Sequence, residues 1–205
     1  MSLKLKRKKV HREPAIPAGT YTAICVGVID IGEQHNVKYN NYQDKIILIF
    51  EIPSQTIEAD GEQKPRWLSQ EYSASLNEKS KLYKTLRSWR AKDFTETELD
   101  EFQLSEMAGE GCMIAVTLIE KDGVQYNNID SVMGIPTDMP LPALQNDILI
   151  YDIDEPDPEV FAKIPSWIQD KIKKSTQHQK NLPDEKLDIP KPDIKEEPKD
   201  GDCPI

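Results

Sequence analysis

Hydrophobic residues gather in five short stretches between residues 19 and 135, each of a length typical of a β-strand. In the first stretch, residues 20–31, alternate positions from Ile24 to Val28 form an apolar face. Gly27 lies inside this run, where a glycine permits the bend that curls the first strand of a small barrel. The pattern predicts a curved, mainly β structure.

The other four stretches differ in their faces. Residues 45–52 are nearly all apolar, which is typical of a strand buried on both faces. Residues 66–74 have no uniformly apolar face, which suits a strand whose outer face meets a ligand. The last two stretches, 112–120 and 124–132, flank a hairpin signal at Lys121-Asp122-Gly123. Polar loops are predicted over 32–42 and over 54–65, the second with a turn at Asp60-Gly61.

Between the third and fourth stretches, apolar residues recur at the spacing of a helix. Leu82, Leu86 and Trp89 should face the sheet. Ser75 and Glu78 have the spacing of a capping box that begins this helix. Thr95 and Glu98 have the same spacing and predict a second, short helix, and Pro165 suits the first turn of another over 165–175.

Five strands with one helix between strands three and four is the order of an OB-fold, a small, partly open barrel that often binds oligonucleotides. We therefore predict an OB-fold, nucleic-acid-binding domain over residues 18–136. We expect a basic flexible arm over 1–17, an acidic linker with a short helix over 137–176, and a disordered acidic tail over 177–205.

The charge of the chain is strongly segregated. Its 205 residues carry a net charge of −10, which taken as a whole argues against binding nucleic acid. However, residues 1–12 hold six basic residues and no acid, whereas residues 151–160 hold five acids and no base. No apolar run is long enough to cross a membrane, and no apolar segment follows the basic N-terminus as in a secretory signal. We expect no contact with membranes and a cytoplasmic location.

Residues that carry catalysis are missing or badly spaced. The sequence has no glycine-rich phosphate loop, and its three histidines lack the spacing of metal ligands. Cys25 and Cys112 lie in apolar runs and Cys203 near the end, so reduced thiols are expected. We predict no enzyme, no metal site and no cofactor.

Basic and aromatic side chains give the stronger signal. Proteins that hold single strands combine cations along a groove with rings on which bases stack. An OB-fold binds its ligand across strands two and three, beside the loops joining strands one and two and strands four and five. The predicted DNA-binding residues are Lys38, Tyr39, Tyr42, Lys45, Arg66, Trp67, Tyr72, Arg90 and Tyr126. In the alternative, the rings pack in the core, the lysines form a solvated face, and the barrel is a protein–protein adaptor.

The C-terminal sequence ends Lys-Asp-Gly-Asp-Cys-Pro-Ile. An acidic segment that ends in proline and an apolar residue resembles the tip of bacterial single-strand-binding proteins, which is acidic and then Ile-Pro-Phe. That tip recruits replication and repair proteins. The resemblance implies a partner-binding site at Asp202, Cys203, Pro204 and Ile205, although Ile205 stands where those proteins have an aromatic residue.

Four stretches carry a wider resemblance: residues 16–23 (Ile-Pro-Ala-Gly-Thr-Tyr-Thr-Ala), 75–90, 94–99 and 164–172. They resemble a family of phage and prophage single-stranded-DNA-binding proteins of OB-fold type, over about residues 15–175. The resemblance implies a non-catalytic accessory factor of phage DNA replication or recombination, in the cytoplasm of a bacterial host cell. A nuclease subunit is a third interpretation, and the sequence leaves open whether the protein forms a homo-oligomer.

Overall fold

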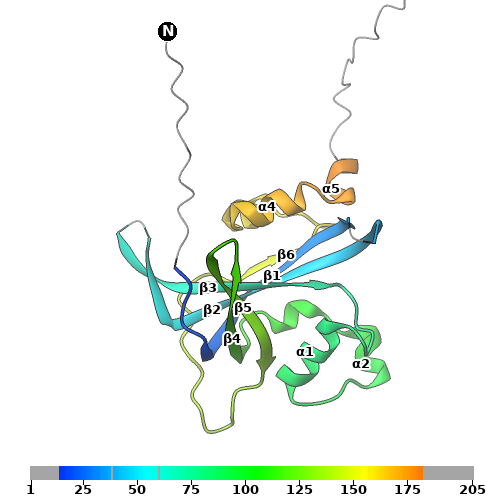
Figure 1. The fold of residues 1–205 in the computed structure, drawn as a ribbon. Helices are drawn as coiled ribbons and strands as arrows, with labels where there is room; N and C mark the ends of the chain where they lie inside the picture. The colour runs from blue at the N-terminus through cyan, green and yellow to red at the C-terminus, as the bar shows by residue number, and fades with distance from the viewer. Residues whose placement is uncertain (1–13, 38, 60, 182–205) are drawn as a thin grey trace, which may run out of the picture.

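The computed structural model describes residues 14–37, 39–59 and 61–181. Five antiparallel strands form a half-barrel sheet in the order β3-β2-β1-β4-β5, so that β3 and β5 are its edges (Figure 1). The strands are β1 (Gly19–Asn36), β2 (Asn41–Ala59), β3 (Glu62–Ser73), β4 (Gly111–Lys121) and β5 (Val124–Met133). The prediction of a mainly β protein is confirmed.

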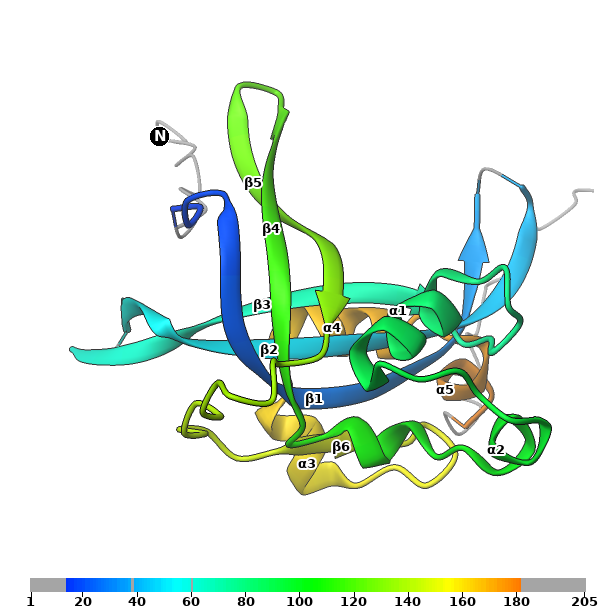
Figure 2. The ribbon, with the colours of Figure 1, turned by 90° about the horizontal axis from the view of Figure 1, so that it is seen from below.

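Strand β1 bends so that it pairs with two neighbours. Its first part, Gly19 to Ile24, pairs with β4, and the part from Ile24 to Asn36 pairs with β2. Figure 2 shows β1 turning from one neighbour to the other. A register shift falls between Cys25 and Gly27, and a Cβ at Gly27 would lie only 2.8 Å from the side chain of Ile49. The bend predicted at Gly27 is confirmed.

The two polar loops predicted from the sequence are wrong for most of their length. Strands β1 and β2 continue as a hairpin to the pair Asn36 and Asn41, and β2 and β3 continue to the pair Ala59 and Glu62. A backbone ladder satisfies the N–H and C=O groups whichever side chains it carries, so polar residues extend a hairpin readily where both faces are solvated. The predicted turn is present at Gly61, whose φ is 79°.

Helix α1 (Lys81–Arg90) lies between β3 and β4, as predicted. Its N-cap, however, is Ser80, whose Oγ accepts the backbone N–H of Tyr83 at 3.0 Å, so the capping box predicted at Ser75 is wrong. The capping box of α2 (Glu96–Glu101) is confirmed, because the Thr95 hydroxyl and the Glu98 carboxylate each accept the other's backbone N–H. A 3₁₀ turn, η1 (Leu104–Met107), precedes β4.

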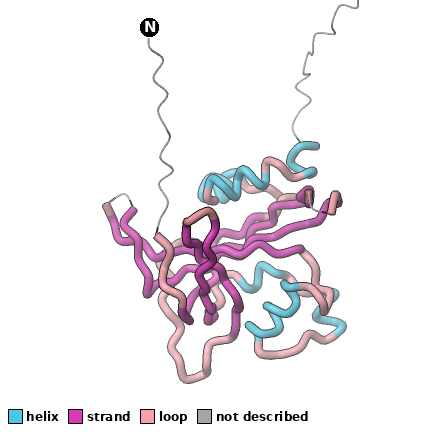
Figure 3. The backbone as a smooth tube through the Cα atoms, viewed as in Figure 1, coloured by secondary structure: helices cyan, strands magenta, loops and turns pink. Residues whose placement is uncertain are grey.

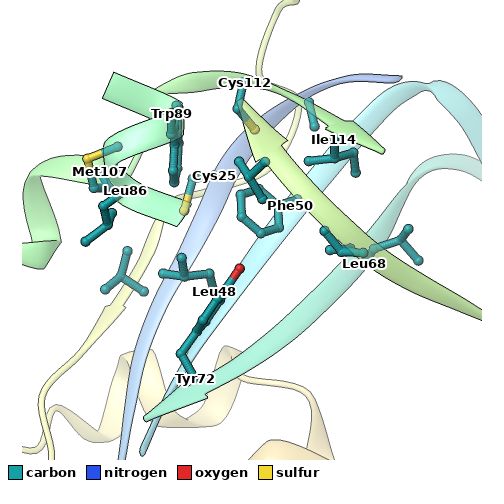
Figure 4. Packing of buried hydrophobic residues seen from close by; sticks show 14 of the residues in the cluster. Cys25, Leu48, Phe50, Leu68, Tyr72, Leu86, Trp89, Met107, Cys112 and Ile114 are labelled. Atoms are coloured by element: carbon teal, nitrogen blue, oxygen red, sulfur yellow. The ribbon is translucent and has the colours of Figure 1, made fainter. Parts of the chain in front are cut away.

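The core inside the half-barrel lies between the sheet and α1. Phe50, Leu86 and Trp89 pack there with the thiols of Cys25 and Cys112 (Figure 4). Both thiols are free and buried, and burial raises the pKa of Cys25 to about 12. The expectation of reduced thiols inside apolar strands is confirmed for this pair.

The outer face of the sheet is covered by the C-terminal part of the chain. It holds β6 (Leu149–Tyr151), α3 (Pro158–Lys163), α4 (Ser166–Ile172) and α5 (Thr176–Asn181), and β6 pairs in parallel with β1. A second buried cluster joins Ile164, Ile168 and Ile172 to Ile29, Ile47 and Ile49 of the sheet. Figure 3 shows helices on both sides of the strands. Only the helix near 165–175 was anticipated from the sequence.

Among the residues described, no helix is both long enough and apolar enough to span a membrane. Lys38 and the tip residues Asp202, Cys203, Pro204 and Ile205 lie outside the described residues.

Candidate nucleic-acid interface

A groove of about 870 Å³ lies where strand β3, strand β5 and helix α4 meet. Its lining includes Arg66 and Trp67 of β3, Tyr126 and Asn127 of β5, and Trp167 of α4. We call this the aromatic groove. The fold thus brings three of the nine predicted DNA-binding residues (Arg66, Trp67 and Tyr126) into one site, together with a second tryptophan that the prediction did not include.

Arg66 and Trp67 point to opposite faces of β3, because successive side chains alternate along a strand. Arg66 is on the side of the inner core and 9% exposed, whereas Trp67 packs against the outer cluster. Both reach the groove because β3 is an edge of the sheet and its side away from β2 is open.

The indole of Trp67 is held by a buried carboxylate. Glu51 is fully buried and lies directly opposite Trp67 in the β2–β3 ladder. Its carboxylate accepts the indole N–H of Trp67 at 3.3 Å, the backbone N–H of Gln145 at 2.8 Å and the amide of Asn146 at 2.5 Å. A buried carboxylate is costly unless it is hydrogen-bonded, so these donors fix the ring and the 145–146 loop together. Glu51 is the only acid in the nearly all-apolar run 45–52, and this was the sequence signal for the residue.

The segment just before β1 is hydrogen-bonded to the same part of the structure. The side chain of Asn127 accepts the backbone N–H of Ile16 at 2.9 Å and donates to its carbonyl at 2.8 Å. Ala15 lines the groove. The chain therefore passes the aromatic groove directly after its basic N-terminal residues, whose positions lie outside the described part.

Tyr72 is not part of this site. Its ring is 3% exposed and packs in the inner core, beneath the ammonium group of Lys81 at 5.7 Å from the ring centre. Burial raises its pKa to about 12. A ring enclosed in this way offers no face to a base, so the prediction that Tyr72 binds DNA is withdrawn. Trp67, the other predicted ring on β3, lies an odd number of positions from Tyr72 and therefore points to the opposite face of the strand.

Tyr39 and Tyr42 lie at the end of the β1–β2 hairpin, 67% and 60% exposed. The ring of Tyr42 contacts that of His35, with 5.0 Å between centres. Both rings are accessible, but neither contributes to the lining of the aromatic groove. Lys45 lies further along β2 and forms an ion pair with Glu71 at 3.5 Å.

Arg90 is committed to contacts within the protein. Its guanidinium lies 4.1 Å from the ring centre of Phe94 and 5.3 Å from that of Phe102, and it forms an ion pair with Glu98. The carboxylate of Glu98 also accepts a hydrogen bond from the ammonium group of Lys92, at 2.8 Å. Arg90 therefore joins α1 to α2, and a guanidinium engaged in this way is not expected to contact DNA, contrary to the prediction from the sequence.

The same contacts of Glu98 make the stability of the fold depend on pH in the acidic range. Lys92, the backbone amide of Thr95 and Arg90 lower the pKa of Glu98 to about 2. A carboxyl whose pKa is lower in the folded than in the unfolded chain, where it is about 4.3, stabilises the fold above that value and ceases to do so as the pH falls toward 2. We expect Glu98→Gln to flatten the loss of thermal stability across this window, measured by circular dichroism. The exposed Glu101→Gln on the same helix is the control, and parallel profiles for Glu98→Gln and the parent protein would contradict the assignment.

No group of three or more His, Cys, Asp and Glu side chains within the described ranges could hold a metal ion. Comparison with models of known protein families gives no match, and no curated protein matches the chain. The half-barrel and the aromatic groove are therefore the features of this protein that bear on its function.

Proposed function

We propose that the protein binds single-stranded DNA in the aromatic groove, without catalysis. The observation that carries this proposal is that Trp67, Tyr126 and Trp167, from three separate elements, line one groove together with Arg66. Rings in a groove stack on unpaired bases of any sequence, each stack contributing about 1–3 kcal/mol. An arginine beside them can contact the phosphates or stack on a base in turn.

The strand order supports the finer proposal that the half-barrel is an OB-fold. The order β3-β2-β1-β4-β5, with α1 between β3 and β4, agrees with that fold. OB-folds hold oligonucleotides across strands two and three, beside the loop joining strands four and five. Here α4 packs on the outer face of β1 and β2. We therefore propose that the single-stranded DNA runs along the side of the sheet formed by β3 and β5, where the groove lies.

The resemblance to phage single-strand-binding proteins gives this activity a setting. We propose a role in phage DNA replication or recombination inside a bacterial cell, in which Asp202, Cys203, Pro204 and Ile205 recruit partner proteins. The six basic residues that precede the groove in the sequence add positive charge for the phosphates.

Titration with a labelled single-stranded oligonucleotide, and with a duplex of the same length, tests the proposal. We expect the single strand to bind more tightly, because its bases are free to stack. Its affinity should fall between about 50 mM and about 200 mM salt, with a log–log slope of about −0.7 for each phosphate neutralised. Absence of binding at the lower salt concentration would contradict the proposal and favour the protein–protein adaptor.

A further inference from the structure

On the outer face of β3, Glu71 lies between two lysines from other elements. Lys45 of β2 reaches one carboxylate oxygen at 3.5 Å, and Lys171 of α4 forms an ion pair with the other. All three side chains are partly exposed, at 19%, 34% and 39% for Lys45, Glu71 and Lys171. We call these residues the Lys–Glu–Lys cluster. It carries one net positive charge and is open to solvent.

This cluster adjoins the aromatic groove. The ammonium group of Lys171 lies 5.7 Å from the ring centre of Trp167, which is one helical turn earlier on α4 and lines the groove. Glu71 and Trp67 lie on the same face of β3, because an even number of residues separates them. The contact between Lys171 and Trp167 therefore joins the Lys–Glu–Lys cluster to the edge of the aromatic groove.

A carboxylate held by two ammonium groups occupies the place that another singly charged anion could take. The backbone of single-stranded DNA presents one negative phosphate per nucleotide. When a base stacks on Trp167, the adjoining phosphate comes within reach of Lys171, and Lys45 lies on the other side of the same carboxylate. We propose that Lys45 and Lys171 bind a backbone phosphate of the DNA, and that Glu71 competes with that phosphate for them. This inference rests on the proposed function.

The inference predicts that loss of an acidic residue strengthens DNA binding at this particular position. Glu71→Gln keeps the shape of the side chain but removes its charge. We expect the affinity for a single-stranded oligonucleotide at low salt to rise about 1.4- to fivefold, the factor that corresponds to the free energies typical of exposed ion pairs. The log–log salt slope should become more negative by about 0.7.

Asp93→Asn is the matched control. Asp93 also belongs to an exposed ion pair, with Arg87, and its replacement changes the net charge of the protein by the same amount. That pair lies by α1, which packs on the inner face of the sheet. We expect its affinity and salt slope to stay close to those of the parent protein.

The Lys171–Glu71 ion pair also attaches α4 to β3, so Glu71→Gln could change DNA binding by loosening α4. Variants of the two lysines distinguish this effect from the binding of a phosphate. Lys45→Gln and Lys171→Gln should each weaken binding and make the salt slope less negative by about 0.7. In Glu71→Gln/Lys171→Gln the gain should disappear. If the gain persists there, release of α4 explains it and the phosphate site is refuted.

Thermal unfolding monitors the fold of each variant. If Glu71→Gln binds no more tightly than Asp93→Asn, the inference is refuted, while DNA binding by the parent protein leaves the proposed function standing. If the parent protein binds no single-stranded DNA, both are refuted.

Discussion

Replacing Ile168 with alanine should lower the free energy of unfolding by about 2–5 kcal/mol, the usual range for truncating a fully buried isoleucine. Ile168 has no exposed surface and lies in the outer cluster, between α4 and the sheet. The cost combines the lost transfer of its methyl groups from water with the cavity left behind. Urea denaturation followed by circular dichroism measures it.

Asp170→Ala is the control, because Asp170 is exposed on the same helix and should change the stability by about 0.5 kcal/mol or less. A similarly small effect of Ile168→Ala would show that α4 contributes little to the fold. A large effect would show that the C-terminal segment is an integral layer of the domain. The DNA binding of Ile168→Ala should be compared with that of the parent protein only under conditions where the variant is fully folded.

The sequence indicated this second layer without identifying it. Residues 45–52 are nearly all apolar, and a strand of that kind must be covered on both faces, once by the barrel interior and once by another element. Helix α1 supplies the first cover and was predicted by its periodicity. The second cover comes from α4, whose Ile168 and Ile172 pack on Ile47 and Ile49. The sheet itself is extended by β6, whose three residues are too few to show any period, so its pairing with β1 could not be predicted.

The candidate site was predictable to a similar degree. Alternation along β3 already implies that Trp67 and Tyr72 point to opposite faces, so only one of them could belong to an outer groove. Trp167 is about a hundred residues from Trp67, and only tertiary packing brings them to one groove. Arg90 pairs with Glu98 on the next helix, and the distance between these two side chains could not be predicted from their spacing in the sequence.

Trp167→Ala should weaken binding of single-stranded DNA by about 1–3 kcal/mol, which corresponds to roughly five- to 150-fold in affinity. Trp167 is 47% exposed, so its removal should disturb the fold less than truncation of a buried ring. Trp67→Phe is the better change at the second position, because it keeps a ring in the groove while removing the N–H that Glu51 accepts. It should reduce affinity less than Trp167→Ala, and fluorescence anisotropy with a labelled oligonucleotide measures both.

Tyr42→Ala is the matched control for these variants, since it removes an exposed ring outside the groove lining. If Tyr42→Ala weakens binding as much as Trp167→Ala does, the DNA path includes the β1–β2 hairpin and the groove alone does not define the site. If Trp167→Ala has no effect, the stacking role of the groove is refuted. Should the rings hold successive bases of one strand, the losses from Trp67→Phe and Trp167→Ala should add, because each ring then acts on its own base. If Trp67→Phe weakens binding by itself but the double variant binds no more weakly than Trp167→Ala, the two rings enclose a single base.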